Sequence, residues 1–251
     1  MIIRRQIIPL FVKRKDTFAV LKIDKYIALN GYCSRRKAYD LISEKKVFVN
    51  NRAATHSTKF NEGDVVVIEG KKLIPKKFVP VYIAYNKPKG IICTTEKIPG
   101  NIIDAVKHPE KIYPVGRLDK DSEGLILLTN HGEIIDKIAN AEFGHEKEYI
   151  VTLNLPVRKK FLDEISAGID LNGEKTKPCK VSLVPETKRL FRITLTQGLN
   201  RQIRRMCNAY DYQVIKLQRV RVMNIELGKL KPDEWRDLTD EELDVLMASL
   251  A

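Results

Sequence analysis

The sequence has little that could bind a metal ion or build a disulfide framework. It contains four cysteines and four histidines in 251 residues. No two cysteines form a CxxC pair, and the histidines are spread along the chain rather than grouped. Zinc sites need clustered Cys and His ligands, and disulfide-stabilised domains need a higher density of cysteines. The sequence therefore predicts no metal site, and reduced thiols of the kind found in cytoplasmic proteins.

Long apolar runs are also missing. No stretch approaches the ~18 consecutive apolar residues that indicate a membrane-spanning helix, so we expect no membrane association. Residues 1–20 contain basic residues and short apolar runs, but they lack the longer apolar region and the cleavage site of a secretory signal. An organelle transit peptide would be richer in serine. We therefore expect residues 1–20 to form a loosely packed N-terminal extension.

Positive charge, in contrast, is abundant. The chain has 45 Lys and Arg against 32 Asp and Glu, which gives a formal net charge of +13. Such an excess attracts polyanions, of which nucleic acids and anionic membrane surfaces are the usual examples.

Residues 21–77 predict a small unit of two helices followed by hairpins. Ser34 is a suitable cap for the second helix, and residues 47–54 predict two strands joined by an Asn-Asn turn. The first turn of that helix carries Arg35, Arg36 and Lys37, although cations at this end oppose the helix dipole. Chains tolerate this cost more readily where the charges bind an anion. A solvated charged face on a small α+β unit would explain the same pattern.

Residues 80–251 predict a larger, mostly antiparallel α+β domain, because many strands are joined by short connections and few helices. The run Leu125–Leu128 has no alternation, which is typical of a strand that is covered on both faces. The next segment predicts a short helix with Asn130 and Glu133 as a capping box. Two segments of this domain, residues 116–130 and 196–207, stand out by their charge.

The first segment, GRLDKDSEGLILLTN, places five charged residues immediately before the buried strand. Removing a carboxylate from water costs several kcal/mol unless it is paired. Asp119 is therefore either a structural ion-pair partner or a reactive group.

The second segment, TQGLNRQIRRMC, predicts a helix that Asn200 could cap. At about 100° per residue, the apolar residues Ile203 and Met206 share the buried face. Arg201 and Arg205 lie on the opposite face and are candidates for binding phosphate. Arg204 lies at the boundary, from which it could reach a partly buried carboxylate.

Together these segments resemble the signature motifs of the pseudouridine synthases that modify ribosomal RNA. The combination of GRLDxxSEGL with QGxNRQIRRM some eighty residues later is highly specific. KPKGIICT and KEY are similar to further motifs of the family. Residues 21–77 resemble the RNA-binding module named after ribosomal small-subunit protein four. His131 departs from the aspartate common at this position, which concerns substrate detail more than chemistry. The C-terminal segment is similar to the branch that acts on large-subunit (23S) rRNA.

The resemblance implies an isomerase without cofactor that converts a uridine of ribosomal RNA to pseudouridine. Asp119 matches the catalytic aspartate, which acts either as a nucleophile at the sugar or as a base. Tyr149 matches the tyrosine that packs against the target base, and Arg204 matches an arginine that holds Asp119 ionised. Arg117 could fill the space that a flipped base leaves in the RNA stack. Arg35, Arg36, Lys37, Arg201 and Arg205 would contact RNA.

The resemblance also implies a cytoplasmic enzyme, which we expect to be a monomer. A tRNA as second substrate stays open. Two other functions are weighed against this one. An RNA-binding ribosome-assembly factor of the same fold would be expected to lack Asp119, Tyr149 or Arg204, and all three are present. A sugar hydrolase would need two carboxylates on opposite sides of its substrate, whereas Asp121 and Glu123 are neighbours of Asp119 on one loop.

Overall fold

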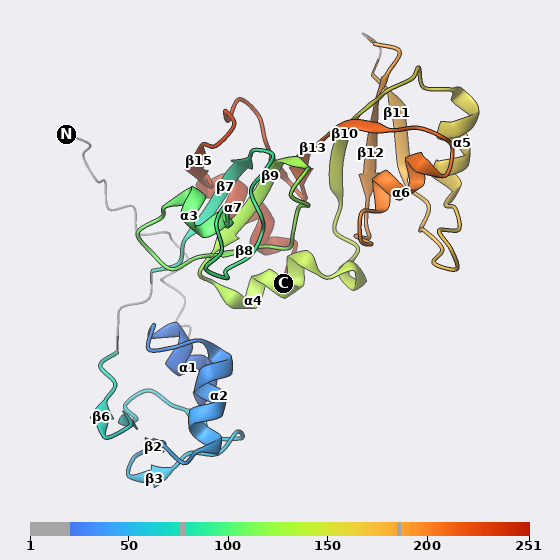
Figure 1. The fold of residues 1–251 in the computed structure, drawn as a ribbon. Coiled ribbons are helices and arrows are strands. Elements are labelled where there is room, and N and C mark those ends of the chain that lie inside the picture. Colours follow the sequence, from blue (N-terminus) through green and yellow to red (C-terminus); the bar gives the residue numbers. More distant parts are fainter. Residues whose placement is uncertain (1–20, 76–78, 185–186) are drawn as a thin grey trace, which may run out of the picture. The chain divides into compact units, whose positions relative to one another are not determined.

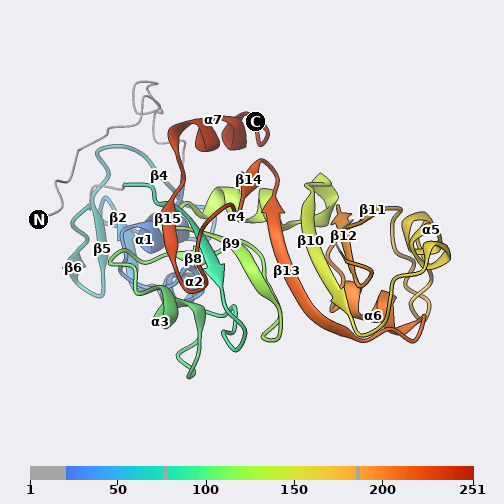
Figure 2. The same cartoon turned by 90° about the horizontal axis from the view of Figure 1, so that it is seen from above.

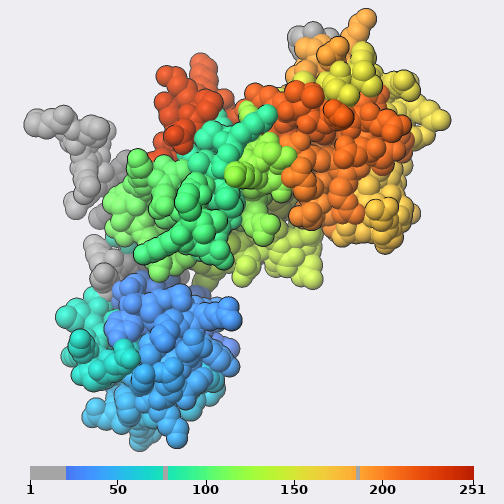
Figure 3. All heavy atoms as spheres, in the orientation of Figure 1, coloured from blue at the N-terminus to red at the C-terminus, as the bar shows by residue number. Residues whose placement is uncertain are grey.

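A computed structural model describes residues 21–75, 79–184 and 187–251. The chain divides into two units, Met1–Val79 and Pro80–Ala251, and the described residues of each have their own apolar core (Figure 1 and Figure 3). The expected N-terminal extension, residues 1–20, lies outside the described residues.

The first unit packs two helices against small antiparallel sheets, as predicted. Ser34 caps α2, because its Oγ accepts a hydrogen bond from the backbone N–H of Lys37 at 3.2 Å. Asn50 and Asn51 both have positive φ and form the turn between β2 and β3. One sheet has the order β3-β2-β5-β6, and β1 pairs with β4. The elements are β1 (Leu21–Lys22), α1 (Ile23–Leu29), α2 (Arg35–Ser43), β2 (Val47–Val49), β3 (Arg52–Ala53), β4 (Lys59–Phe60), β5 (Val66–Ile68) and β6 (Lys71–Lys72).

The second unit is built on a nine-stranded sheet. Its main order is β11-β12-β10-β13-β9-β7-β15, with β14 paired to β13 and β8 paired to β9. All neighbouring pairs are antiparallel except β9 and β13, so the mostly antiparallel α+β fold is as predicted. The strands are β7 (Tyr82–Lys87), β8 (Tyr113–Pro114), β9 (Glu123–Thr129), β10 (Lys147–Leu153), β11 (Lys180–Leu183), β12 (Leu190–Leu195), β13 (Val214–Val222), β14 (Ile225–Glu226) and β15 (Trp235–Asp237).

The helices of this unit cover two halves of the sheet (Figure 2). α5 and α6 pack against β10 and β12, whereas α3, α4 and α7 pack around β7 and β9. Strand β9 is covered on both faces, because alternate residues enter the α4–α7 core and the α3 core. This confirms the prediction for Leu125–Leu128. The helices are α3 (Ile102–Val106), α4 (Gly132–Ala139), η2, a 3-10 helix (Ala141–Phe143), α5 (Lys159–Ala167), α6 (Gln202–Asn208) and α7 (Asp240–Ala248).

The two halves of the sheet meet where β9 runs parallel to β13, with Glu123 opposite Gln218 and Gly124 opposite Arg219. Gly124 has a φ of +103°, and a Cβ at this position would lie 2.2 Å from the carbonyl oxygen of Arg219. Any side chain would therefore collide with the backbone of β13, so glycine permits the close approach. This contact holds the loop before β9 beside β13.

Candidate active site

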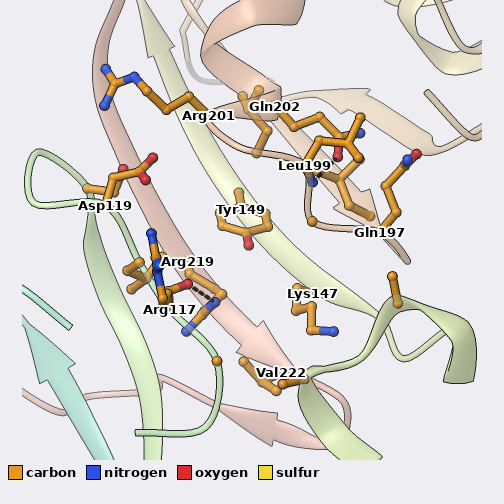
Figure 4. A pocket seen from close by; sticks show the side chains of 18 of the residues that line it. Arg117, Asp119, Lys147, Tyr149, Gln197, Leu199, Arg201, Gln202, Arg219 and Val222 are labelled. Carbon is orange, nitrogen blue, oxygen red and sulfur yellow. Dashed lines mark hydrogen bonds between the residues drawn. The ribbon is translucent and has the colours of Figure 1, made fainter. Parts of the chain in front are cut away.

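A cavity of about 460 Å³ opens in the second unit beside the junction of β9 and β13. Its walls come from the loop before β9, from β10 and β13, and from the segment that leads into α6 (Figure 4). The side chains that line it include both charged groups and apolar groups from strands distant in sequence. The charged lining residues are Arg117, Asp119, Lys147, Arg201 and Arg219.

Asp119 lies in the loop between β8 and β9, and its side chain is half-buried at the cavity. Its backbone carbonyl accepts a hydrogen bond from the N–H of Ser122 at 3.1 Å, which closes a turn of this loop. Within residues 21–75, 79–184 and 187–251, no side chain or backbone group donates a hydrogen bond to its carboxylate. The loop therefore presents an uncommitted acceptor to the cavity.

Asp121, two residues later, has the opposite surroundings. Arg201 donates two hydrogen bonds to its carboxylate, at 3.0 and 2.9 Å. Nε of Arg204 lies 3.3 Å from Oδ2 of the same carboxylate. The hydrogen bonds from Arg201, together with the charge of Arg204, hold the pKa of Asp121 below its ordinary value. Asp121 thus fastens the loop to the start of α6.

The expected pairing of Arg204 with Asp119 is wrong for this structure. Nη1 of Arg204 donates to the carbonyl oxygen of Val214 at 3.1 Å, and Nη2 donates to that of Asp121 at 3.0 Å. Nη2 also lies 3.5 Å from Oγ of Ser122. The side chain is at the edge of the buried face, as the helical projection predicts, but it faces the second carboxylate of the loop rather than the first. Its partners are those of a group that holds the loop in shape.

Arg201 and Arg205 also have protein partners. Arg201 binds Asp121 as described above, and it lines the cavity. Arg205 donates to Glu174 at 2.8 Å and to the carbonyl oxygen of Leu171 at 2.7 Å. A phosphate would have to share or displace these acceptors, so the RNA-binding role of both arginines stays a prediction. Asn200 does not cap α6, because Arg201 occupies the N-cap position with a φ of 48°.

Tyr149 and Arg117 line the same cavity as Asp119. Tyr149 is half-buried on β10, opposite Ile193 of β12 and Arg219 of β13. Arg117 is exposed, and its carbonyl oxygen accepts a hydrogen bond from Arg219 at 3.4 Å. In Figure 4, Asp119, Tyr149 and Arg219 lie around one opening. An aromatic ring, an arginine and a carboxylate are thereby brought together from three separate segments.

The sequence interpretation missed Arg219 and Lys147. Arg219 is only 4% exposed, and its Nε donates to the carbonyl oxygen of Leu125 at 2.6 Å. Its position on β13, two residues after the buried Leu217, would have placed it on an inward face. Lys147 lies two residues before Tyr149 and shares its face of β10. The period of two could therefore have identified both residues.

Lys147 lines the cavity and donates from Nζ to the carbonyl oxygen of Ile138 at 3.2 Å. Burial, assisted by the nearby charge of Arg219, lowers the pKa of Lys147 to about 8. The side chain is thus a cation in a setting that disfavours charge.

The basic residues of α2 belong to the first unit. Arg35 donates from Nε to Asp24 at 2.6 Å, with 59% of its side chain exposed. Arg36 and Lys37 are exposed at the first turn of the helix. Among the described residues, none forms an ion pair with Arg36 or Lys37.

Neither a metal centre nor a membrane span is found in the part of the chain that the structure describes. No three His, Cys, Asp or Glu residues there are grouped so that they could hold a metal ion. No described helix is long and apolar enough to cross a membrane.

Comparison with known proteins matches one family model to part of each unit. Residues 81–209 match the model of the RNA pseudouridylate synthase family, and residues 21–66 match the S4 domain. The chain is 48% identical over 225 residues to the dual-specificity RNA pseudouridine synthase RluF of Escherichia coli K12, covering 89% of this chain and 77% of the relative. It is 36% identical over 235 residues to the ribosomal large subunit pseudouridine synthase B of Bacillus subtilis, covering 90% and 96% of the two chains.

A solved structure agrees with these matches. The crystal structure of a pseudouridylate synthase superposes with a TM-score of 0.66 at 30% sequence identity. The match covers 90% of this chain and 99% of the other.

Proposed function

The chain belongs to the RNA pseudouridine synthase family, and from this premise we propose that it isomerises uridine in large-subunit ribosomal RNA with Asp119 as its catalytic carboxylate. It is an RNA-modifying isomerase with an N-terminal S4 domain. The observation that carries the residue assignment is the carboxylate of Asp119, which lies uncommitted at a cavity of about 460 Å³ while the neighbouring Asp121 is held by arginines. The name of the Bacillus subtilis relative supports the large subunit as the source of the substrate.

The reaction breaks the bond between C1′ of the ribose and N1 of uracil, turns the base, and joins C1′ to C5. The electron pair of the broken bond stays on the uracil ring. Asp119 either forms a temporary bond to C1′ or removes the proton from C2′, and the carboxylate is regenerated in both cases. The C5 proton leaves at the end, and N1 gains a proton, so atoms and charge balance without a cofactor.

Tyr149 supplies a ring face on which the target uracil can stack, because it lines the cavity beside Asp119. The uridine has to leave the RNA stack to reach this cavity. Arg117 is exposed at the rim and can occupy the space that the base leaves in the RNA. These roles combine the cavity geometry with the motif that each residue matches.

Arg204 and Arg219 act by holding the catalytic loop. Arg204 bonds the backbone of Asp121 from α6, and Arg219 bonds the backbone of Arg117 from β13. The loop is therefore fixed on both sides of Asp119. Arginine suits this task, since its planar guanidinium group binds several acceptors at once.

Arg35, Arg36 and Lys37 on α2 add affinity for the RNA backbone through phosphate contacts. Arg201 and Arg205 add affinity for RNA only if a phosphate binds them beside the carboxylates with which they already form ion pairs. A tRNA as second substrate is compatible with the dual specificity in the name of the Escherichia coli relative. We expect a monomer that acts in the cytoplasm, where ribosomal RNA is assembled.

Mapping pseudouridines in total RNA tests the proposal. A strain that lacks this protein should lose pseudouridine at one or more positions of large-subunit rRNA. Purified enzyme should restore these sites in a transcript of the same RNA. An unchanged rRNA map together with loss at tRNA positions alone would contradict the rRNA assignment. No change in any RNA would favour a role in ribosome assembly.

A further inference from the structure

Lys147 offers the cavity more hydrogen-bond donors than the protein uses. An ammonium group has three N–H donors. Within the described part of the chain, the ammonium group of Lys147 has one acceptor, the carbonyl oxygen of Ile138 near the C-terminal end of α4. The remaining donors can serve a ligand in the cavity that Lys147 lines.

Lys147 and Asp119 lie on opposite sides of Tyr149 in the cavity. The two residues are two positions apart on β10, so their side chains leave the same face of the strand about 7 Å apart. Figure 4 shows both side chains at the same cavity, with Asp119 on the far side of Tyr149 from Lys147. A uracil stacked on Tyr149, with its ribose at Asp119, would direct its far edge towards Lys147. The oxygens on that edge are carbonyl groups.

The surroundings of Lys147 favour a strong interaction with a developing anion. Ile138, whose carbonyl oxygen Lys147 bonds, and Val222, which lies opposite Lys147 on β13, also line the cavity. A charge interaction is stronger where apolar groups exclude water. Burial lowers the pKa of Lys147 to about 8, so the group remains mainly cationic at neutral pH.

On the proposed function, we propose that Lys147 is a catalytic residue whose ammonium group hydrogen-bonds a carbonyl oxygen of the target uracil and stabilises the negative charge that forms when the C1′–N1 bond breaks. The electron pair of that bond becomes delocalised over N1 and the two carbonyl oxygens. Lys147 transfers no proton in this step. It stabilises the separated uracil anion until C5 bonds to C1′, when the charge is lost from the ring oxygens.

The first experiment compares Lys147→Met with Lys147→Arg. Methionine keeps the length of the side chain without its charge, and arginine keeps the charge. Lys137→Met is the control, because Lys137 also bonds a backbone carbonyl, that of Leu250, and does not line the cavity. At saturating enzyme, Lys147→Met should slow single-turnover pseudouridine formation about 100-fold, and Lys147→Arg should retain much of the rate. Lys137→Met should match the wild type.

An rRNA transcript with 5-fluorouridine at the target site tests whether Lys147 interacts with the negative charge on the departing base. Fluorine withdraws electrons, so the base leaves more readily and needs less help from the protein. The defect of Lys147→Met in C1′–N1 cleavage should therefore shrink to about tenfold or less with this substrate. An equal defect with both bases, together with weaker binding and a smaller salt dependence, would overturn the proposal in favour of a phosphate contact. An unchanged rate in Lys147→Met would also overturn it.

The dependence of the rate on pH provides a second test. It can be used even if Lys147→Met fails to fold, because it compares the wild type with Lys147→Arg. The charged or titratable groups that line the cavity with Lys147 are Arg117 and Asp119 on the loop, Tyr149 on β10, Arg201 before α6 and Arg219 on β13, and the charge of Lys147 also acts on His145 before β10. If the cationic form is required, the wild-type rate at saturating RNA falls as the pH rises through about 8.

Lys147→Arg should not show this fall below about pH 9, because arginine stays protonated there. A wild-type rate that rises between about pH 7 and 9 and follows deprotonation of Lys147 would overturn the proposal. Failure of the wild type to form any pseudouridine would instead refute the proposed function.

Discussion

Two helices of the protein, α2 in the first unit and α6 in the second, begin with a cluster of basic residues and have no acidic residue in their first turn. On α2, Arg35, Arg36 and Lys37 are exposed, and the recorded ion pair joins Arg35 to Asp24. On α6, each arginine is bound to a carboxylate or a carbonyl group of the protein. Similar sequences therefore serve different purposes, one open to solvent and the other committed to internal contacts.

The difference shows that a basic cluster is open to an external anion only where the protein leaves part of its charge unpaired. The arginines of α6 lie opposite a loop that carries two carboxylates. One of these, Asp121, accepts the arginines, and the other, Asp119, faces the cavity. On the proposed function, the charge before β9 therefore serves two purposes, an anchor at Asp121 and a reactive group at Asp119.

The largest expected effect separates these two carboxylates. Asp119→Asn should leave a folded protein that still binds RNA. It should slow pseudouridine formation by several orders of magnitude, because an amide neither attacks C1′ nor accepts the proton from C2′. The matched variant Asp121→Asn should keep measurable turnover. Single-turnover rates at saturating enzyme check both. Retention of a substantial part of the wild-type rate by Asp119→Asn would refute its assignment.

The second prediction concerns the anchor. Lysine cannot bond Val214 and the backbone of Asp121 at the same time, so Arg204→Lys should lower the free energy of unfolding by about 1–3 kcal/mol. It should also slow the chemical step by about 100-fold, since the loop that carries Asp119 is displaced. Urea unfolding and single-turnover rates measure the two effects. Arg205→Lys is the control and should stay near wild type, because its partner Glu174 is half exposed. The reverse ranking of the two variants would show that Arg205, rather than Arg204, holds the loop that carries Asp119.

The third prediction tests α2 as a binding surface. Replacing Arg36 and Lys37 together by glutamine should weaken rRNA binding about tenfold and reduce the salt slope by about two, at an unchanged single-turnover rate. The charge-matched control replaces Lys229 and Lys231, which are exposed in the second unit. RNA-binding curves at two salt concentrations distinguish the two double variants. A lowered rate at saturating RNA would mean that α2 also shapes the active site.

The smallest expected effect is on the free energy of unfolding at acid pH. The hydrogen bonds from Arg201 are the main reason why the pKa of Asp121 lies below its ordinary value. This carboxylate therefore stabilises the fold above about pH 4, and the stabilisation is lost as the pH falls through its folded-state pKa. Its side chain is 46% exposed, so the contribution should be under about 1 kcal/mol. The stability difference between wild type and Asp121→Asn should therefore shrink between about pH 6 and 3. A constant difference would show that the charge of Asp121 does not contribute.

Much of the fold follows from the sequence, because the cues are local. Ser34 caps α2, the two asparagines turn between β2 and β3, and the apolar run of β9 is covered on both faces. The capping box at Asn130 and Glu133 was wrong, because the side chain of Asn130 accepts a hydrogen bond from the N–H of Val81. The two residues of this contact are 49 positions apart in the sequence, so a local pattern does not predict it.

The sequence pointed to several residues that line the cavity, among them Asp119 and Tyr149, but not to the contacts between them. The helical projection placed Arg204 correctly at the edge of the buried face of α6, yet it could not tell which of two carboxylates two residues apart would face it. That choice depends on how the loop turns at Ser122 and on the parallel contact of β9 with β13. Arg219 approaches the loop only through this contact, so its role emerges from strand order rather than from a motif.

The most direct test of the account follows the hydrogen on C5 of the target uridine. A large-subunit rRNA transcript labelled with tritium at C5 of uridine should release tritium to water with the wild-type enzyme, in amounts equal to the pseudouridine formed and without free uracil. Release of free uracil would indicate a hydrolase. Absence of tritium release from this RNA and from tRNA, by folded protein that binds them, would contradict the isomerase assignment.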